Sequence, residues 1–234
     1  AERLYRQSLE LREELGDRRG MASSWGVLGD IENVRGNWDA AERLYRQSLE
    51  LREELGDRRG MASSWGVLGD IENVRGNWDA AERLYRQSLE LREELGDRRG
   101  MASSWGVLGD IENVRGNWDA AERLYRQSLE LREELGDRSS ASEVTCDMGT
   151  NELQRGNFEE AEIWFTKALK QLEALGKLDY IAECNFRLAQ LWQRRNNSER
   201  AQRHYAIAHK IYTELGAKKD LERIEREFIS DTDP

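Results

Sequence analysis

The sequence predicts an all-α protein built as a solenoid of antiparallel helix pairs. A segment of 40 residues occurs three times in succession without a change, at residues 1–40, 41–80 and 81–120, and the copy continues to Arg138. Apolar residues recur at helical spacing, no segment alternates as a strand does, and the single proline is Pro234. A fixed period of this length is typical of a solenoid, in which each unit buries its apolar face against the next.

The first helix of each unit is predicted over residues 19–35. Its apolar side chains recur every three or four residues, and Gly36 follows as a residue that can end a helix. The recurring positions are Met21, Trp25, Leu28, Ile31 and Val34.

The second helix is predicted over residues 39–55 and ends at Gly56, which can adopt the left-handed conformation. Asn37 and Asp39 are candidate N-caps, and Asp39 with Glu42 has the spacing of a capping box. The positions that recur at helical spacing are Ala41, Leu44, Tyr45, Ser48, Leu49, Arg52 and Leu55. Each unit is therefore expected to be one helix pair.

The identity of the copies carries a separate inference about their origin. Because sequence drift erases identity, the copies come either from a very recent amplification or from an engineered array. The sequence leaves both origins open.

Eight positions in each unit follow a spacing that belongs to a known pattern. They are Trp25, Leu28, Gly29, Gly36, Trp38, Ala41, Tyr45 and Ser48. This spacing resembles the signature of the tetratricopeptide repeat family, although Glu53 stands where that family usually has proline. The unit is longer than the ordinary repeat of about 34 residues, and is similar to the longer repeats of Leu-Gly-Asn scaffold proteins and bacterial tetratricopeptide arrays. The resemblance implies a right-handed superhelix whose concave groove is lined by the first helix of each pair.

The register of the repeat divides the chain into four parts. Residues 1–16 are expected to be a lone second helix, and residues 17–138 hold three identical units. Residues 139–216 hold two divergent units that keep similar apolar residues, and residues 217–234 form a C-terminal capping helix and tail. Divergence at an end is typical of capping repeats, whose outer face meets water.

The family resemblance places the candidate binding site on the concave face of the first helices. Glycine and serine there allow another backbone to approach closely, and aspartate and asparagine supply acceptors and donors for a peptide. Such a face favours an extended peptide or partner protein with basic or donor-rich side chains; the alternative is a merely solvated helix face. The candidate residues are Ser23, Gly26, Asp30, Asn33, Ser63, Gly66, Asp70, Asn73, Ser103, Gly106, Asp110 and Asn113.

Two departures from the family limit which ligands this face suits. Chaperone-binding members use Lys and Asn to grip a terminal carboxylate, whereas this chain has Gly26 and Asp30 at those positions. A carboxylate clamp is therefore not expected on this face. The Leu-Gly-Asn tripeptide is here Leu28-Gly29-Asp30, so the ligands of those scaffolds do not transfer directly.

Charge and composition disfavour several classes of partner. The net charge is −10, each identical unit carries eight acids and six arginines, and all six lysines lie from Lys167 onward. Neither nucleic acid nor an anionic membrane surface suits such a chain. Cys146 and Cys184 are not spaced as metal ligands and are expected to be reduced thiols, which with the absence of a leader or apolar span favours the cytoplasm.

The sequence offers no constellation for catalysis, so no enzyme activity, cofactor or metal is expected. His204 and His209 are the only histidines, and their spacing of five does not let two imidazoles share a metal on a helix. Neither a phosphate-binding loop of the Walker type nor a nucleophile elbow is present.

These observations favour a non-catalytic protein-interaction scaffold with a peptide or partner protein in the concave groove. One alternative is the C-terminal sensor arm of a larger bacterial signalling NTPase. Another is a self-assembling or engineered scaffold, in which the apolar edge of residues 1–15 docks head-to-tail on a second copy. Helical-repeat recognition of RNA is disfavoured by the acidic charge.

Overall fold

The computed structural model describes residues 2–230, and within this range the chain forms twelve helices and no strand. Contacts divide the chain into two compact units, Ala1–Leu108 and Gly109–Pro234, each of them made of helix pairs. The helices are α1 (Glu2–Leu15), α2 (Arg18–Val34), α3 (Trp38–Leu55), α4 (Arg58–Val74), α5 (Trp78–Leu95), α6 (Arg98–Val114), α7 (Trp118–Glu134), α8 (Arg138–Arg155), α9 (Phe158–Leu175), α10 (Leu178–Arg194), α11 (Ser198–Leu215) and α12 (Lys218–Ser230).

The helix ends follow from local chemistry at a few residues. Gly36 and Gly56 end α2 and α3 with φ values of 77° and 66°, in the left-handed region that glycine adopts without a steric penalty. At the start of α2, Asp17 accepts a hydrogen bond of 3.0 Å from the backbone N–H of Gly20. The observed α2 and α3 each begin one residue earlier than the ranges predicted from the sequence.

The predicted capping box at the start of the second helix is wrong. Asn37 occupies the N-cap position of α3, but its side chain makes no capping hydrogen bond and donates instead to Glu32 Oε2 at 2.7 Å. Asp39 and Glu42 both pair with Arg75, at the end of the first helix of the next unit. The acids of this turn therefore form ion pairs with the next 40-residue repeat.

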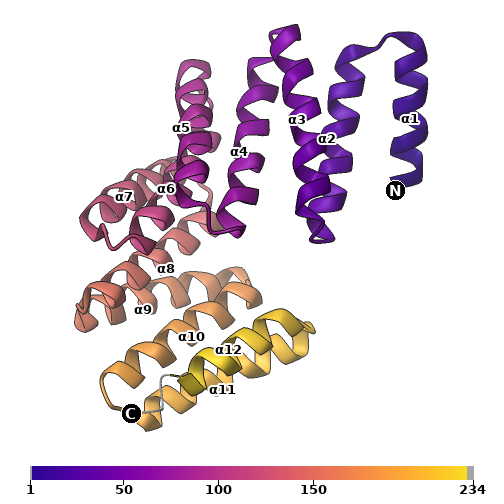
Figure 1. Cartoon of the computed structure of the whole chain (residues 1–234). Helices are drawn as coiled ribbons and strands as arrows, with labels where there is room; N and C mark the ends of the chain where they lie inside the picture. Colours follow the sequence, from indigo (N-terminus) through magenta and orange to yellow (C-terminus); the bar gives the residue numbers. More distant parts are fainter. Residues whose placement is uncertain (1, 231–234) are drawn as a thin grey trace. The chain divides into compact units, whose positions relative to one another are not determined.

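Close approach of the two helices in a pair depends on a glycine opposite an aromatic ring. A Cβ atom at Gly29 would lie 2.7 Å from Cε1 of Tyr45, and Tyr45 is itself buried. Ser48 of α3 donates a buried hydrogen bond of 2.7 Å to the carbonyl of Ala22 in α2. Figure 1 shows α1 to α5 as a row of antiparallel helices, and this glycine contact recurs in α4, where Gly69 faces Tyr85.

Successive pairs are joined by an apolar layer and by arginine. Leu68 and Ile71 of α4 pack against Ala41 and Tyr45 of α3 in one buried cluster. At the edge of this layer Arg75 donates to Glu42 Oε2 at 2.6 Å, which lowers the pKa of Glu42. The interface between α3 and α4 therefore combines apolar burial with an ion-pair network.

The tryptophans of the first helix pair are only partly buried. Trp25 is half-buried, and Trp38 at the turn between the helices is 38 % exposed. The smaller side chains Ala41 and Ser48 are fully buried. In the pair of α2 and α3, small, aliphatic and tyrosine side chains thus form the centre and the tryptophans lie at the edge, whereas Trp192 of α10 is buried in the core.

Helix α12 packs against the last helix pair of the second unit. Ile224 of α12 is fully buried against α10 and α11, and the ring of Phe228 stacks on that of Tyr205 with 4.0 Å between centroids. The predicted tail at residues 231–234 lies outside the described residues. At the other end of the chain, α1 exposes apolar side chains, with Leu4, Leu11 and Leu15 at 69 %, 59 % and 80 %.

Candidate functional site

The structure places the predicted site residues on one stretch of α2, α4 and α6. Within the first unit, Ser63 and Asp70 of α4 are exposed and Gly66 is half-buried between them. The same arrangement holds for Ser23, Gly26 and Asp30 of α2. In α6, Ser103 is exposed, Gly106 is buried and Asp110 is half-buried.

A small pocket of about 130 Å³ opens on this face within the first unit. It lies where the first helix of one pair, its second helix and the first helix of the next pair meet. The side chains that line it are Ser63, Gly66, Val67 and Asp70 from α4, Tyr85 and Arg92 from α5, and Ser103, Ser104 and Val107 from α6. Ser63, Gly66, Asp70 and Ser103 of the predicted set therefore line one pocket, together with residues that the sequence analysis did not single out.

Asp70 is held in place by a tyrosine and keeps one oxygen available. Tyr85 donates a hydrogen bond of 2.6 Å to Oδ1 of Asp70, and the equivalent bond from Tyr45 to Asp30 measures 2.7 Å. Although Asp70 as a residue is exposed, desolvation of its carboxyl group by the surrounding protein raises its pKa, and this hydrogen bond and the charge of Arg92 partly offset the rise. Among the described residues no hydrogen bond reaches Oδ2 of Asp70, so this oxygen can accept one from a ligand.

Arg92 is the functional candidate that the sequence analysis missed. Its Nη1 donates to the carbonyl of Gly100 at 2.8 Å and to Oγ of Ser104 at 2.9 Å, which joins α5 to α6. Its Nε is buried without a hydrogen-bond partner, and Nη2 lies 3.3 Å from the Cβ position of Gly66. Burial lowers the pKa of Arg92, with the charges of Asp97 and Asp70 acting in the opposite direction. The face is therefore not the purely negative ladder that the aspartates alone indicate.

The asparagines at the end of this stretch differ in their side-chain hydrogen bonds from one repeat to the next. Asn33 and Asn73 are half-buried and make no side-chain hydrogen bond within the described part of the chain. Asn113 donates to Oδ1 of Asn151 in α8 at 2.9 Å. Two of the three predicted amides thus remain available for a ligand, and the third is occupied by the protein.

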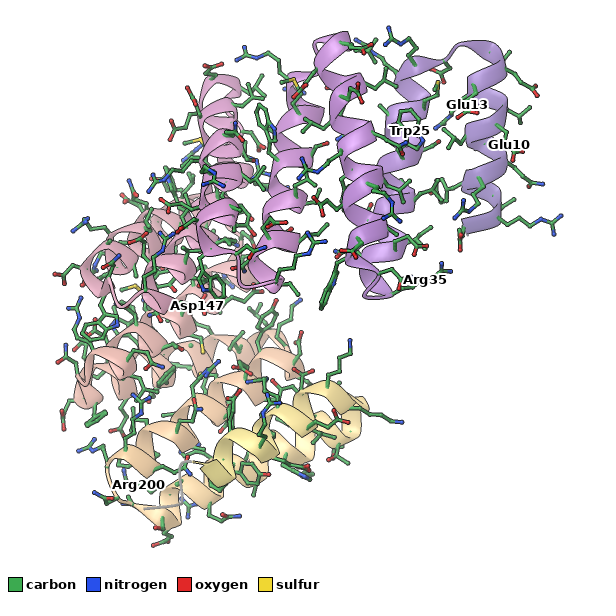
Figure 2. The ribbon with its side chains drawn as sticks, in the orientation of Figure 1. Glu10, Glu13, Trp25, Arg35, Asp147 and Arg200 are labelled. Carbon is green, nitrogen blue, oxygen red and sulfur yellow. The ribbon has the colours of Figure 1, made fainter. Side chains whose placement is uncertain are left out.

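In the second unit the charges of this face change position. Asp110 accepts a hydrogen bond of 2.8 Å from Tyr125, and burial raises its pKa to about 6. Asp147 of α8, labelled in Figure 2, occupies the position of Val107 and has a pKa well above the usual range because of burial and the nearby Asp110. The next helix carries Arg187 at the same position. This part of the face therefore adds a second carboxylate, Asp147, to the repeated pair of Asp110 and Arg132.

The remaining chemistry-bearing residues are satisfied within the fold. Cys146 and Cys184 are buried free thiols, as predicted. His204 lies 2.9 Å from Oδ1 of Asn185, and burial lowers its pKa. Within the described residues no group of three or more His, Cys, Asp or Glu side chains is arranged to hold a metal ion. No helix in that range is both long and apolar enough to span a membrane.

Comparison with known proteins places the repeats in a family. The tetratricopeptide repeat model matches four overlapping segments, at residues 1–54, 20–94, 60–134 and 100–174. The chain belongs to the tetratricopeptide repeat family. No curated protein sequence matches this tetratricopeptide chain.

Several solved structures share the tetratricopeptide fold at low sequence identity. BtubC (BKLC) from P. vanneervenii aligns with a TM-score of 0.76 and 19 % identity over 92 % of this chain and 91 % of its own. The Rap conjugation gene regulator of the plasmid pLS20, in complex with the Phr* peptide, aligns with a TM-score of 0.78 and 14 % identity over 92 % of this chain and 60 % of its own. A signal transduction ATPase with a tetratricopeptide repeat sensor from Pyrococcus horikoshii aligns with a TM-score of 0.73 and 20 % identity over 94 % of this chain and 33 % of its own.

Proposed function

We propose that this tetratricopeptide chain is a non-catalytic interaction scaffold that binds an extended peptide segment of a partner protein along α2, α4 and α6. The observation that carries the proposal is the pocket of Asp70, Arg92 and Ser103, which combines a carboxylate oxygen, a buried guanidinium N–H and hydroxyl groups. The Rap regulator, which has the same fold, was solved with a bound peptide. That likeness supports a peptide as the class of ligand.

The chemistry of the pocket suits a group that both donates and accepts hydrogen bonds. A backbone amide or a side-chain amide of a peptide could donate to Oδ2 of Asp70 and accept from Arg92. Gly66 leaves room for such an approach, because it has no side chain to fill the pocket. The sequence alone favoured a basic or donor-rich ligand, and the paired charges favour a polar, uncharged or zwitterionic segment among these.

The first test compares peptide binding by the natural chain with that of a variant in which Asp30, Asp70 and Asp110 are replaced by Asn. Peptides selected on the immobilised natural chain would be titrated by calorimetry against the single, double and triple variants. Because each substitution removes one charged acceptor, we expect the affinity to fall in steps, by about fivefold per engaged site. Asn retains an acceptor for the neighbouring tyrosine, so the fold should be preserved.

The matched control replaces Glu50, Glu90 and Glu130 by Gln. These acids recur with the same period on exposed positions of α3, α5 and α7, so the control changes the net charge equally. Its affinity should equal that of the natural chain. If both triple variants bind equally well, peptide binding at this face is excluded.

A second candidate function is the sensor arm of a larger signalling ATPase. The observation that favours it is the match to the tetratricopeptide sensor of the Pyrococcus horikoshii protein, of which this chain corresponds to 33 %. The two candidates are compatible, since a sensor arm also needs a ligand-binding face. The coding sequence upstream of this chain decides: a phosphate-binding loop of the form GxxxxGK[ST] would support the sensor arm, and an unrelated upstream region would exclude it.

A further inference from the structure

A second groove lies within the second unit and shares no lining residue with the pocket of Asp70 and Arg92. It has a volume of about 770 Å³, within the range of small-molecule and peptide-residue sites. It is lined by residues from the end of α7, the first turns of α8 and the C-terminal half of α9. The lining residues used below are Arg138, Ala141, Lys167, Lys170, Gln171 and Ala174.

The groove exists because the divergent unit has lost side-chain volume. Positions 80 residues earlier belong to an identical unit and carry Met61, Leu91 and Glu94. Ala141, Gln171 and Ala174 replace them in the second unit. Gln171 is about as large as Leu91, so the lost volume is that of Met61 and Glu94, which fill the corresponding space in the first unit. The two alanines leave that space open in the second.

The same substitutions leave a cation without its partner. In the first unit Arg58 pairs with Glu94, and Arg18 pairs in the same way with Glu54. Arg138 occupies the position of Arg58, but the acid is replaced by Ala174, and Arg138 makes no ion pair within residues 2–230. An exposed guanidinium at the edge of the groove is thus available to an external anion.

Two lysines reinforce this charge. Lys167 and Lys170 replace the glutamine and glutamate of the identical units, and both line the groove. Glu133 is the single acidic residue in the lining, so three cations face one carboxylate. In a chain of net charge −10 this is a local inversion of charge, and it favours a ligand that carries a carboxylate.

Gln171 adds a polar contact that the protein leaves unmade. Its Oε1 is buried, and no hydrogen-bond donor within the described part of the chain reaches it. A buried acceptor without a donor is costly, and a ligand that supplies an N–H removes that cost. The groove therefore favours a ligand that carries both a hydrogen-bond donor and a negative charge.

We propose that this groove binds the C-terminal residues of a partner protein that ends in an aliphatic side chain. A chain terminus offers the three required groups together: a carboxylate for Arg138 and Lys170, a backbone N–H for Gln171, and an apolar side chain for the space beside Ala141 and Ala174. An internal acidic residue also brings a carboxylate and a backbone N–H, and the comparison of a free with an amidated C-terminus distinguishes the two kinds of ligand. The site is independent of the helix face proposed to bind extended peptides.

The test titrates the full chain with an acetylated hexapeptide that ends in leucine, by isothermal calorimetry. The same peptide with an amidated C-terminus should bind at least about tenfold more weakly, because it lacks the charge-assisted hydrogen bonds. Acetate alone should bind far more weakly than the peptide, because it cannot fill the apolar space. A peptide and an amide of equal affinity, acetate as tight as the peptide, or no binding of the peptide would each overturn the proposal.

Two variants restore residues of the identical units, and therefore should fold. Ala174→Glu returns the acid that pairs with the arginine, and Ala141→Met refills the space. Each should abolish binding of the hexapeptide, whereas Gln202→Glu, which adds the same charge as Ala174→Glu on an exposed position of α11, should not change it. Unchanged binding in both restored variants would contradict the site, whatever the outcome at the α2, α4 and α6 face.

Discussion

Buried carboxylates determine how individual residues of this protein respond to pH. Burial raises the pKa of Asp110 to about 6, with opposing contributions from Tyr125 and Arg132. Hydrogen bonding from Arg75 acts in the opposite direction on Glu42, whose pKa is lowered. The two kinds of carboxylate therefore contribute to stability in different pH ranges.

The substitution Asp110→Asn should weaken the pH dependence of the free energy of unfolding. Because the folded pKa of Asp110 lies above its unfolded value of about 4, its contribution to folding is fully present below about pH 4 and is lost as pH rises through about 6. The natural chain should therefore lose roughly 1–3 kcal/mol between pH 5 and pH 7.5 through this group, and Asp110→Asn should lose less. Urea unfolding at several pH values measures the difference.

The control for this prediction is Glu173→Gln on the exposed face of α9. It removes one carboxylate from the same unit and should keep the pH dependence of the natural chain. Below about pH 4.5 both chains should lose stability, because Glu42 becomes protonated and its ion pair with Arg75 is lost. Equal slopes between pH 5 and pH 7.5 for the natural chain and Asp110→Asn would contradict the assignment of buried charge to Asp110.

At the scale of one element, the stability of the helix pair depends on the close contact between one glycine and an aromatic ring. A Cβ atom at Gly29 would lie 2.7 Å from the ring of Tyr45, whereas the nearest group to a Cβ at Gly26 is the end of Arg52, at 3.5 Å. Alanine at either position gains about 1 kcal/mol of helix propensity. At position 29 this gain is opposed by overpacking of about 1–3 kcal/mol against the ring of a buried tyrosine.

We therefore expect Gly26→Ala to raise the urea midpoint and Gly29→Ala to lower it. Both variants make the same chemical change in the same helix, three residues apart, so each serves as the control of the other. Comparable midpoints for the two would show that the close helix contact at Tyr45 does not limit stability.

The elements themselves could be predicted from sequence, because their signals are local. Helical spacing and the glycines at positions 36 and 56 give α2 and α3 to within one residue. The capping box at Asp39 and Glu42 could not be judged locally, since both acids pair with Arg75 in the next unit. Arg52 and Arg92 were also missed as site residues, although the helical pattern placed Arg52 on the inward face among Ser48 and Leu55. The roles of these residues depend on contacts between neighbouring repeats, and the sequence of a single repeat does not reveal such contacts.

At the scale of the whole molecule, identity and divergence have separate consequences. The identical units repeat one set of polar groups, so affinity for an extended ligand should grow with the number of engaged units. The divergent units lose that set and gain a cationic groove beside Arg138. A regular array thus supplies the repeated face, and departures from the repeat supply a local site.

The central claim is that a peptide lies along α2, α4 and α6, and a crystal structure of the chain with a selected peptide tests it most directly. Within the first unit we predict a peptide amide in the pocket of Asp70, Arg92 and Ser103, with a hydrogen bond to Oδ2 of Asp70. A peptide bound instead on the exposed positions of α3 and α5, around Glu50 and Glu90, with that pocket empty, would contradict the claim.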